Sequence, residues 1–212
     1  MKEFWNQSWD HVDMSRVSEY IEHMKSTGPS SDPIIDYLKR QQAKIVCDAG
    51  CGCGAYSLKL ALNGFKVFGF DISPVAVNLA KELLSSGNIE HGDFQARDIL
   101  ATGFDENQFD AVVSRDVVDH MSFKNGVEAI RELYRIVKKD GSIIITLDQL
   151  DAEYEAEPHI INSDGDYLFT DGKWDGMVFH PYAESEISRL VQVGTIAALE
   201  SVADGLQVVI VK

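Results

Sequence analysis

The feature that most restricts the fold is a stretch with alternating glycines, VCDAGCGCGAY at residues 46–56. An apolar run that predicts a strand lies at 45–47, and a helical stretch follows at 55–62. Gly50, Gly52 and Gly54 let the backbone adopt positive φ angles and let a ligand approach the main chain closely. A strand, a glycine loop and a helix in this order are typical of the ligand-binding edge of an open α/β sheet. The loop alone allows three occupants: a pyrophosphate, a metal ion held by thiols, or another ligand.

Strand and helix patterns alternate after the loop. Apolar runs at 67–70, 111–113 and 143–145, with a weaker one at 94–96, predict further strands. Helical stretches lie between them at 74–87 and 124–137. Two final apolar runs, 195–202 and 206–211, flank a turn and predict an antiparallel hairpin. The pattern predicts a Rossmann-like, doubly wound α/β fold with a mostly parallel sheet and helices on both faces.

The length of 212 residues fits one domain, which divides into four segments. A helical cap is expected at 1–43, with one helix ending at Gly28-Pro29 and another beginning at Asp32-Pro33. The ligand-binding core is expected at 44–148. A polar and aromatic insertion without clear period follows at 149–182, on the substrate side. A helix at 184–191 and the hairpin complete the C-terminal segment, 183–212.

Charge and composition exclude several classes of partner. Asp and Glu total 34 against 19 Lys and Arg, and the net charge of −15 repels a phosphate backbone, so no nucleic-acid partner is expected. No apolar run approaches the roughly 18 residues of a membrane span, and the N-terminus lacks the core of a signal peptide. The three cysteines lie within seven positions and cannot form a disulfide framework, so we expect a cytoplasmic location. The oligomeric state is not indicated.

Three aspartates follow three successive predicted strands. Asp48, before the glycines, would oppose a pyrophosphate but suits a ligand that carries an ammonium and a sulfonium. Asp71 can accept hydrogen bonds from both hydroxyls of a ribose, and Asp98 can accept one from an adenine amino group. With no basic residue among the glycines, these acids indicate a nucleoside without phosphates.

Two other interpretations of the loop are weaker. Cys51 and Cys53 could be a pair of metal ligands, but a structural zinc ion needs four, and no second pair follows at a suitable spacing. We therefore expect no metal in the glycine loop or elsewhere. The loop also matches a loose dinucleotide fingerprint, and Tyr134 and Lys138 have the spacing found in short-chain dehydrogenases. Because Tyr134 falls on the apolar stripe of its helix, packing explains it more simply, and an NAD(P)-dependent oxidoreductase stays an alternative.

The motifs together resemble those of the class I S-adenosylmethionine (SAM)-dependent methyltransferases. The resemblance lies in VCDAGCGCG (46–54), FGFDIS (68–73), RDI (97–99), FDAVVS (109–114) and KKDGSI (138–143), which occur in the order of the family. It implies a seven-stranded sheet whose last strand is antiparallel, and S-adenosylhomocysteine as the product. It also implies that the loop of Gly50, Cys51, Gly52 and Gly54, with Asp48, holds the methionine moiety. The ribose would bind Asp71, the adenine would contact Ile72, Asp98 and Ile99, and the backbone near Ser114 and Arg115 would approach the amino-acid end.

The acceptor side is predicted from residues after the fourth strand. Asp116 and His120 lie where the acceptor should meet the methyl group, with His120 as a general base or an acid orienting the substrate. Alternatively, Asp119 caps a helix and His120 packs beneath the rim. Tyr20, His180 and Tyr182 are aromatic or imidazole groups expected to bind substrate.

The Asn/Asp-Pro-Pro-Tyr string of amino-methylating nucleic-acid and glutamine enzymes is absent, so we predict a methyltransferase of small molecules. A protein that binds SAM without catalysis is the main alternative.

Overall fold

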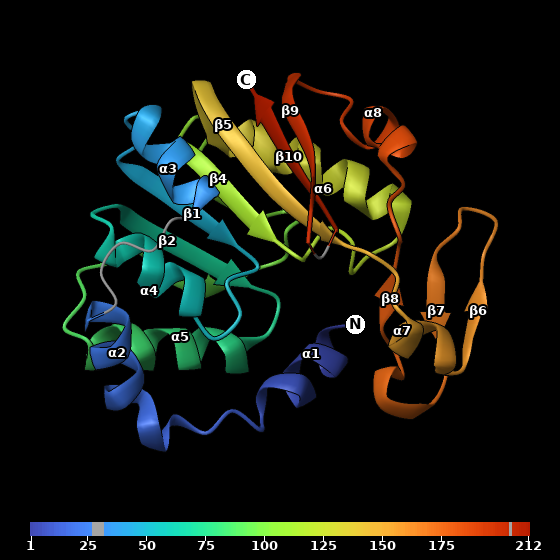
Figure 1. Cartoon of the computed structure of the whole chain (residues 1–212), viewed down its shortest axis with the longest axis horizontal. Helices are drawn as coiled ribbons and strands as arrows, with labels where there is room; N and C mark the ends of the chain where they lie inside the picture. The colour runs from blue at the N-terminus through green and yellow to red at the C-terminus, as the bar shows by residue number, and fades with distance from the viewer. Residues whose placement is uncertain (27–31, 204) are drawn as a thin grey trace.

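The computed structural model describes residues 1–26, 32–203 and 205–212, so the expected helix end at Gly28-Pro29 lies outside the described residues. The central element is a seven-stranded sheet with the order β3-β2-β1-β4-β5-β10-β9 (Figure 1). The strands are β1 (Ile45–Ala49), β2 (Lys66–Asp71), β3 (Phe94–Ala96), β4 (Phe109–Arg115), β5 (Val137–Asp148), β9 (Thr195–Val202) and β10 (Gly205–Val211). The first five run parallel, and β10 is antiparallel to both β5 and β9. The predicted fold class is confirmed.

Helices cover both faces of the sheet because alternate strand residues point to opposite sides. On one face, Val112 and Ile143 pack with α6 (Phe123–Ile136). On the other, Val113 and Ile144 pack with the group formed by α3 (Pro33–Arg40), α4 (Ala55–Leu62) and α5 (Pro74–Ser86). The sheet is therefore buried on both sides through its centre, which leaves its strand ends as the place where a ligand can reach it.

Capping side chains define where the helices begin. The Asp32 carboxylate accepts hydrogen bonds from the amides of Ile34 and Ile35, and the Ser73 hydroxyl accepts one from the amide of Ala76. Both helices begin with a proline, and the start of α3 agrees with the prediction from Asp32-Pro33. The start of α5 matters for function because it follows the end of β2 directly.

The N-terminal segment is helical, as expected, and its first helix lies away from the sheet. It contains α1 (Lys2–Trp9), a 3₁₀ turn (Met14–Arg16) and α2 (Val17–Ser26). Within α1 no residue is buried, and within α2 only Ile21 is. Figure 1 shows α1 between α5 and the segment that carries β8.

The insertion is more regular than the sequence predicts. It contains α7 (Ala152–Ala156) and a second, antiparallel sheet of β6 (His159–Ile161), β7 (Tyr167–Phe169) and β8 (Val178–Phe179), which protrudes from the main body (Figure 1). A 3₁₀ turn, Gly172–Trp174, separates β7 from β8. The sequence shows no clear period here because strands of two or three residues are too short to produce one.

The C-terminal segment agrees with expectation except in its helix. The predicted helix at 184–191 is a 3₁₀ turn, Glu184–Glu186, followed by the short α8 (Ile187–Leu190). The hairpin of β9 and β10 is present and adds two strands to the main sheet. Because β10 pairs with β5, the chain end reinforces the strand that leads into the insertion.

Candidate functional site

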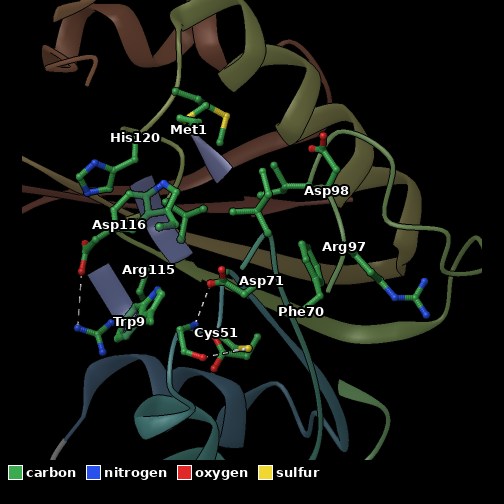
Figure 2. Close-up of a pocket in the computed structure, with 18 of the residues that line it drawn as sticks. Met1, Trp9, Cys51, Phe70, Asp71, Arg97, Asp98, Arg115, Asp116 and His120 are labelled. Carbon is green, nitrogen blue, oxygen red and sulfur yellow. Dashed lines mark hydrogen bonds and ion pairs between the residues drawn. The ribbon is translucent and has the colours of Figure 1, made fainter. Parts of the chain in front are cut away.

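A cavity of about 450 Å³ lies at the carboxyl ends of β1, β2 and β4, beside the reversal of strand order between β1 and β4 (Figure 2). Most of the residues predicted to bind cofactor or acceptor line it. They are Asp48, Gly50, Cys51, Gly52, Asp71, Ile72, Asp98, Ile99, Arg115, Asp116 and His120. The size is that of an ordinary small-molecule site.

The glycine loop brings bare backbone to the cavity. Gly50, Gly52 and Gly54 have φ angles of 79°, 51° and 85°, in the left-handed region that side chains disfavour. The amides of Gly50 and Cys51 donate to the carbonyl oxygen of Phe70, at 2.8 and 2.9 Å, and so join the loop to the end of β2. The loop is thereby held with its main chain along the cavity.

Close packing explains two of these glycines further. A Cβ at Gly52 would lie 2.8 Å from the indole of Trp9, and one at Gly54 would lie 2.8 Å from the Cβ of Ala80 on α5. Gly54 precedes α4 and does not line the cavity. Its role in the structure is the packing of α4 on α5.

Asp48 and Asp71 are both buried at the wall of the cavity. Asp48 is 2% exposed, and its Oδ2 accepts a 2.5 Å hydrogen bond from the Ser57 hydroxyl. Burial raises the pKa of Asp48 to about 6, although the Ser57 bond and the charge of Arg115 act in the opposite direction. Asp71 accepts from the amides of Gly52 and Ser73, at 3.0 and 2.9 Å, and burial raises its pKa as well.

Asp98 differs from the other two acids in being exposed. It follows β3, and its Oδ1 accepts a hydrogen bond from the amide of Leu100 at 2.9 Å. Next to it, Ile99 is 9% exposed and lies in the main hydrophobic core. This corner of the cavity therefore combines an apolar wall with a carboxylate at the solvent edge.

Arg115 and Asp116 lie at the end of β4. The Arg115 guanidinium lies 4.5 Å from the ring centre of Tyr56, and its Nη2 is 4.0 Å from Oδ2 of Asp116. Asp116 has a φ of 54°, which is uncommon for a residue with a side chain. The Thr146 hydroxyl donates to Asp116 Oδ1 at 2.6 Å. These contacts hold the carboxylate of Asp116 at the cavity wall, where Figure 2 shows it beside His120.

His120 is both packed and accessible to the cavity. Its side chain is 11% exposed, and its ring centre lies 5.0 Å from that of Trp5 and 5.6 Å from that of Phe179. Burial lowers the pKa of His120 to about 4, so the imidazole is neutral at neutral pH. The predicted alternative had Asp119 as a helix cap, but the side chain that caps α6 belongs to Ser122. Asp119 instead accepts from the amide of Asp148 at 3.0 Å.

Five predicted site residues do not line this cavity. Gly54 packs between helices, and Ser114 is fully buried within β4. Tyr20 lies on α2 and is 40% exposed. His180 and Tyr182 are buried next to each other, 4.4 Å apart between ring centres, and His180 Nδ1 is 2.8 Å from Asp166 Oδ1. Among the aromatic residues of the insertion, Phe179 packs against the ring of His120, which lines the cavity.

No residue of α1 was assigned to the site from the sequence. Met1, Trp5 and Trp9 line the cavity, together with Tyr56 from the first turn of α4. Three tryptophans occur in the whole chain, and two of them lie here. That concentration is the signal that could have identified α1 as part of the site.

None of the three cysteines belongs to a group of three or more metal-type ligands among the described residues. Cys47 and Cys51 are buried, and burial raises the pKa of both thiols, which disfavours the thiolate that binds metals. The one group of three metal-type ligands among the described residues contains no cysteine.

The fold and the glycine loop together define a class I, Rossmann-like methyltransferase. The sequence model of a family described as a methyltransferase domain matches residues 40–192, and the chain belongs to that family. It is 32% identical to a phosphoethanolamine N-methyltransferase from Plasmodium falciparum over 136 residues, 62% of this chain and 50% of that protein. It is 33% identical to a chloroplastic tocopherol O-methyltransferase from Arabidopsis thaliana over 114 residues, 53% of this chain and 32% of that protein. The chain spans half or less of the length of these curated relatives.

Solved structures show the same fold at low identity. The PH0226 protein from Pyrococcus horikoshii OT3 has a TM-score of 0.71 and 20% identity, covering 99% of this chain and 98% of that chain. Magnesium protoporphyrin IX methyltransferase from Synechocystis PCC 6803, solved with bound SAM, has a TM-score of 0.57 and 20% identity over 98% of this chain and 88% of that chain. Among the described residues, no helix has the length and apolar character needed to cross a membrane.

Proposed function

We propose that this chain is a SAM-dependent methyltransferase that acts on a small-molecule acceptor and releases S-adenosylhomocysteine. The observation that carries the proposal is the cavity in which the bare glycine loop meets Asp48, Asp71 and Asp98 at one edge of the sheet. Family membership supports it, because the match covers residues 40–192 and so includes every one of these elements. When bound, SAM supplies a methyl group made electrophilic by its sulfonium.

The residues of the cavity fit this cofactor. Gly50 and Gly52 leave main chain exposed where a side chain would collide with Val117 or Trp9. Asp48 offers a carboxylate for the ammonium group of the methionine moiety. Asp71 would accept hydrogen bonds from the ribose hydroxyls. The negative charges of Asp48 and Asp71 would repel a pyrophosphate, so these residues favour a cofactor without phosphates.

The remaining polar groups suit the two ends of the cofactor. The guanidinium of Arg115, near Asp48 and over Tyr56, can pair with the methionine carboxylate. At the other end, Ile72 and Ile99 can contact the adenine and Asp98 can accept from its amino group. The residues proposed here for the two ends of SAM are those that the sequence analysis assigned to them.

Asp116 and His120 are proposed to contact the acceptor. Both line the side of the cavity away from Asp98 (Figure 2), and His120 packs against the α1 indole of Trp5. Much of the protein's contribution would be to align the acceptor atom with the methyl group and to exclude water. The relatives named above act on phosphoethanolamine and tocopherol, which supports a small acceptor with a nitrogen or oxygen nucleophile. We propose a cytoplasmic enzyme without nucleic-acid partners, in keeping with the charge of −15.

Calorimetry tests the cofactor assignment. We expect SAM and S-adenosylhomocysteine to bind and NAD(P) not to bind. Asp71→Ala should weaken SAM binding by at least about 1 kcal/mol, the scale of a charge-assisted hydrogen bond. Asp175→Ala, an exposed acid of the insertion outside the cavity, serves as the control. Binding of NAD(P) without affinity for either sulfur nucleoside would refute the proposal.

Turnover tests the acceptor assignment. A panel of small amines, phenols, thiols and carboxylates is screened for release of S-adenosylhomocysteine, and the best acceptor is used for kinetics. His120→Ala should then lower turnover while SAM affinity stays unchanged. Undiminished turnover would remove His120 from the acceptor site. A protein that binds SAM tightly but releases no product with any acceptor would instead be a SAM-binding protein without catalysis.

A further inference from the structure

A group of three metal-type ligands lies beside the acceptor end of the cavity: Asp119, His120 and Asp148. One ligand atom from each lies within 4.8 Å of the other two. Asp119 and His120 follow β4, and Asp148 is the last residue of β5. Because β4 and β5 are neighbouring parallel strands, the ends of both strands meet at one edge of the sheet. The group therefore results from the fold itself and is not a chance cluster on the surface.

The Asp119 carboxylate has unused binding capacity. The residue is fully buried, with 0% of its surface exposed. Its Oδ2 accepts the amide of Asp148 at 3.0 Å, while its Oδ1 has no hydrogen-bond partner among the described residues. Buried polar atoms are normally satisfied, so an orphaned carboxylate oxygen points to a ligand that has not been accounted for.

The position of His120 suits a second metal ligand beside Asp119, and His120 is too far from Asp119 for a hydrogen bond. Its Nε2 lies 4.0 Å from Asp119 Oδ2, beyond hydrogen-bond distance. Two atoms bound to one divalent ion at about 2.1 Å each are separated by roughly 3 to 4 Å, so a small closure would bring both onto an ion. The Nδ1 of His120 also lacks a partner among the described residues.

The surroundings favour a cation. Asp116 adds a third carboxylate close to Asp119, and Arg115 makes its ion pair with Asp116 at 4.0 Å. On the other side, Phe179 and Tyr154 pack with ring centres 4.7 Å apart, and Phe179 packs against His120. Aromatic side chains packed on one side of a buried negatively charged centre lower the local dielectric constant and so strengthen its attraction for a positive ion.

We propose that Asp119, His120 and Asp148 bind a divalent transition-metal ion. Two carboxylates and an imidazole suit Mn²⁺, Fe²⁺ or Zn²⁺ and do not suit ions that require thiolates. Three protein ligands leave coordination positions for water, or for an oxygen of an acceptor in the adjoining cavity. The second of these possibilities rests on the proposed methyltransferase function, whereas the binding of the ion does not.

Binding of Mn²⁺ tests the proposal directly. The chain is freed of metal with EDTA, returned to metal-free buffer and titrated with Mn²⁺, and the electron paramagnetic resonance signal of free Mn²⁺ is recorded. Mn²⁺ avoids the thiols of the glycine loop, so its binding reports on the oxygen and nitrogen ligands. We expect one ion per chain.

Variants connect the binding to these residues. Asp119→Asn, His120→Ala and Asp148→Asn should each weaken Mn²⁺ binding by at least about tenfold, since even outer partners of metal ligands are worth that much. Asp175→Asn is the matched control and should bind Mn²⁺ like the unaltered chain. Asp119→Asn keeps an oxygen that can accept the amide of Asp148. If it nevertheless fails to fold, His120→Ala and Asp148→Asn decide the matter, because both residues are partly exposed.

The result separates this proposal from the proposed function. SAM calorimetry on the same variants should give the affinity of the unaltered chain, because none of the three carries a cofactor assignment. Loss of Mn²⁺ binding with intact SAM binding supports the metal site. No change in the Mn²⁺ signal, or equal binding by the control and all three variants, overturns it and leaves the cofactor assignment untouched.

Discussion

At Asp48, burial favours the protonated carboxyl group, whereas the proposed binding of an ammonium group requires the ionised one. The side chain is 2% exposed, and burial raises its pKa to about 6 from an ordinary value of 3.8. The folded protein therefore takes up this proton at a higher pH than the unfolded chain does. Keeping Asp48 ionised above pH 6 lowers stability by up to about 3 kcal/mol, and this penalty is relieved as pH falls toward 4. A carboxylate retained at that cost is expected to bind a positive group.

SAM affinity should accordingly depend on pH through Asp48. Below pH 6 the ionised fraction falls, and the dissociation constant should rise by up to about tenfold per pH unit. Calorimetric titrations with SAM between pH 5 and 8 measure this change in the dissociation constant. Asp71 also faces the site and has a raised pKa, so the decisive comparison is with Asp48→Asn, which should bind weakly and with less dependence on pH. Equal pH dependence in both proteins would contradict the assignment.

The aspartates of the site could be predicted from sequence because a short stretch of neighbouring residues is enough to show where a strand ends. Asp48 and Asp71 end buried apolar runs, and a parallel sheet brings such ends to one edge. His180 and Tyr182 were expected at the substrate and lie outside the cavity lining. Their position depends on how the insertion packs on α6, and no short stretch of sequence carries that information.

At the scale of elements, α1 contributes to the site more than to the fold. It has no buried residue, yet Trp5 and Trp9 line the cavity. Its contacts with the body include the hydrogen bond of the Ser73 hydroxyl to Asn6 Oδ1 at 2.8 Å and the approach of Trp9 to Gly52. The sequence predicts a helical cap at 1–43, but the surface that α1 covers results from contacts distant in sequence.

Removing the two indoles should therefore separate binding from stability. The double variant Trp5→Ala, Trp9→Ala should unfold with a free energy within about 0.5 kcal/mol of the unaltered chain, because neither side chain is in a core. Its SAM affinity should fall by about 1 kcal/mol or more through loss of apolar contact. Urea unfolding and calorimetry measure the two quantities.

Trp174→Ala is the matched control for this variant. Trp174 contacts Phe4 and Tyr154 but does not line the cavity, so SAM affinity should be retained. A double variant that keeps full affinity for SAM would show that α1 is not part of the cofactor site.

At the scale of the whole molecule, the order of the strands and helices was predictable because the parallel strands β1, β2, β4 and β5 are largely buried and read as apolar runs. The small sheet of β6, β7 and β8 was not, since it depends on a separate aromatic cluster around Phe169, Met177 and Phe179. Charge is the other property that belongs to the entire chain. The excess of 15 negative charges is distributed over a protein of 212 residues, and like charges repel in the compact state.

Salt should therefore stabilise this protein. Repulsion among the excess carboxylates is screened as the Debye length falls to about 10 Å at roughly 0.1 M salt. Salt also weakens exposed pairs such as Arg16 with Glu19 and Arg131 with Glu128, but each is worth at most about 1 kcal/mol and often much less. We expect Tm to rise from low salt to moderate NaCl in the presence of EDTA, which removes divalent ions as a cause. KCl at equal ionic strength should have the same effect, because screening does not depend on the identity of the cation. A Tm that falls with NaCl would mean that the attractive pairs outweigh the repulsion.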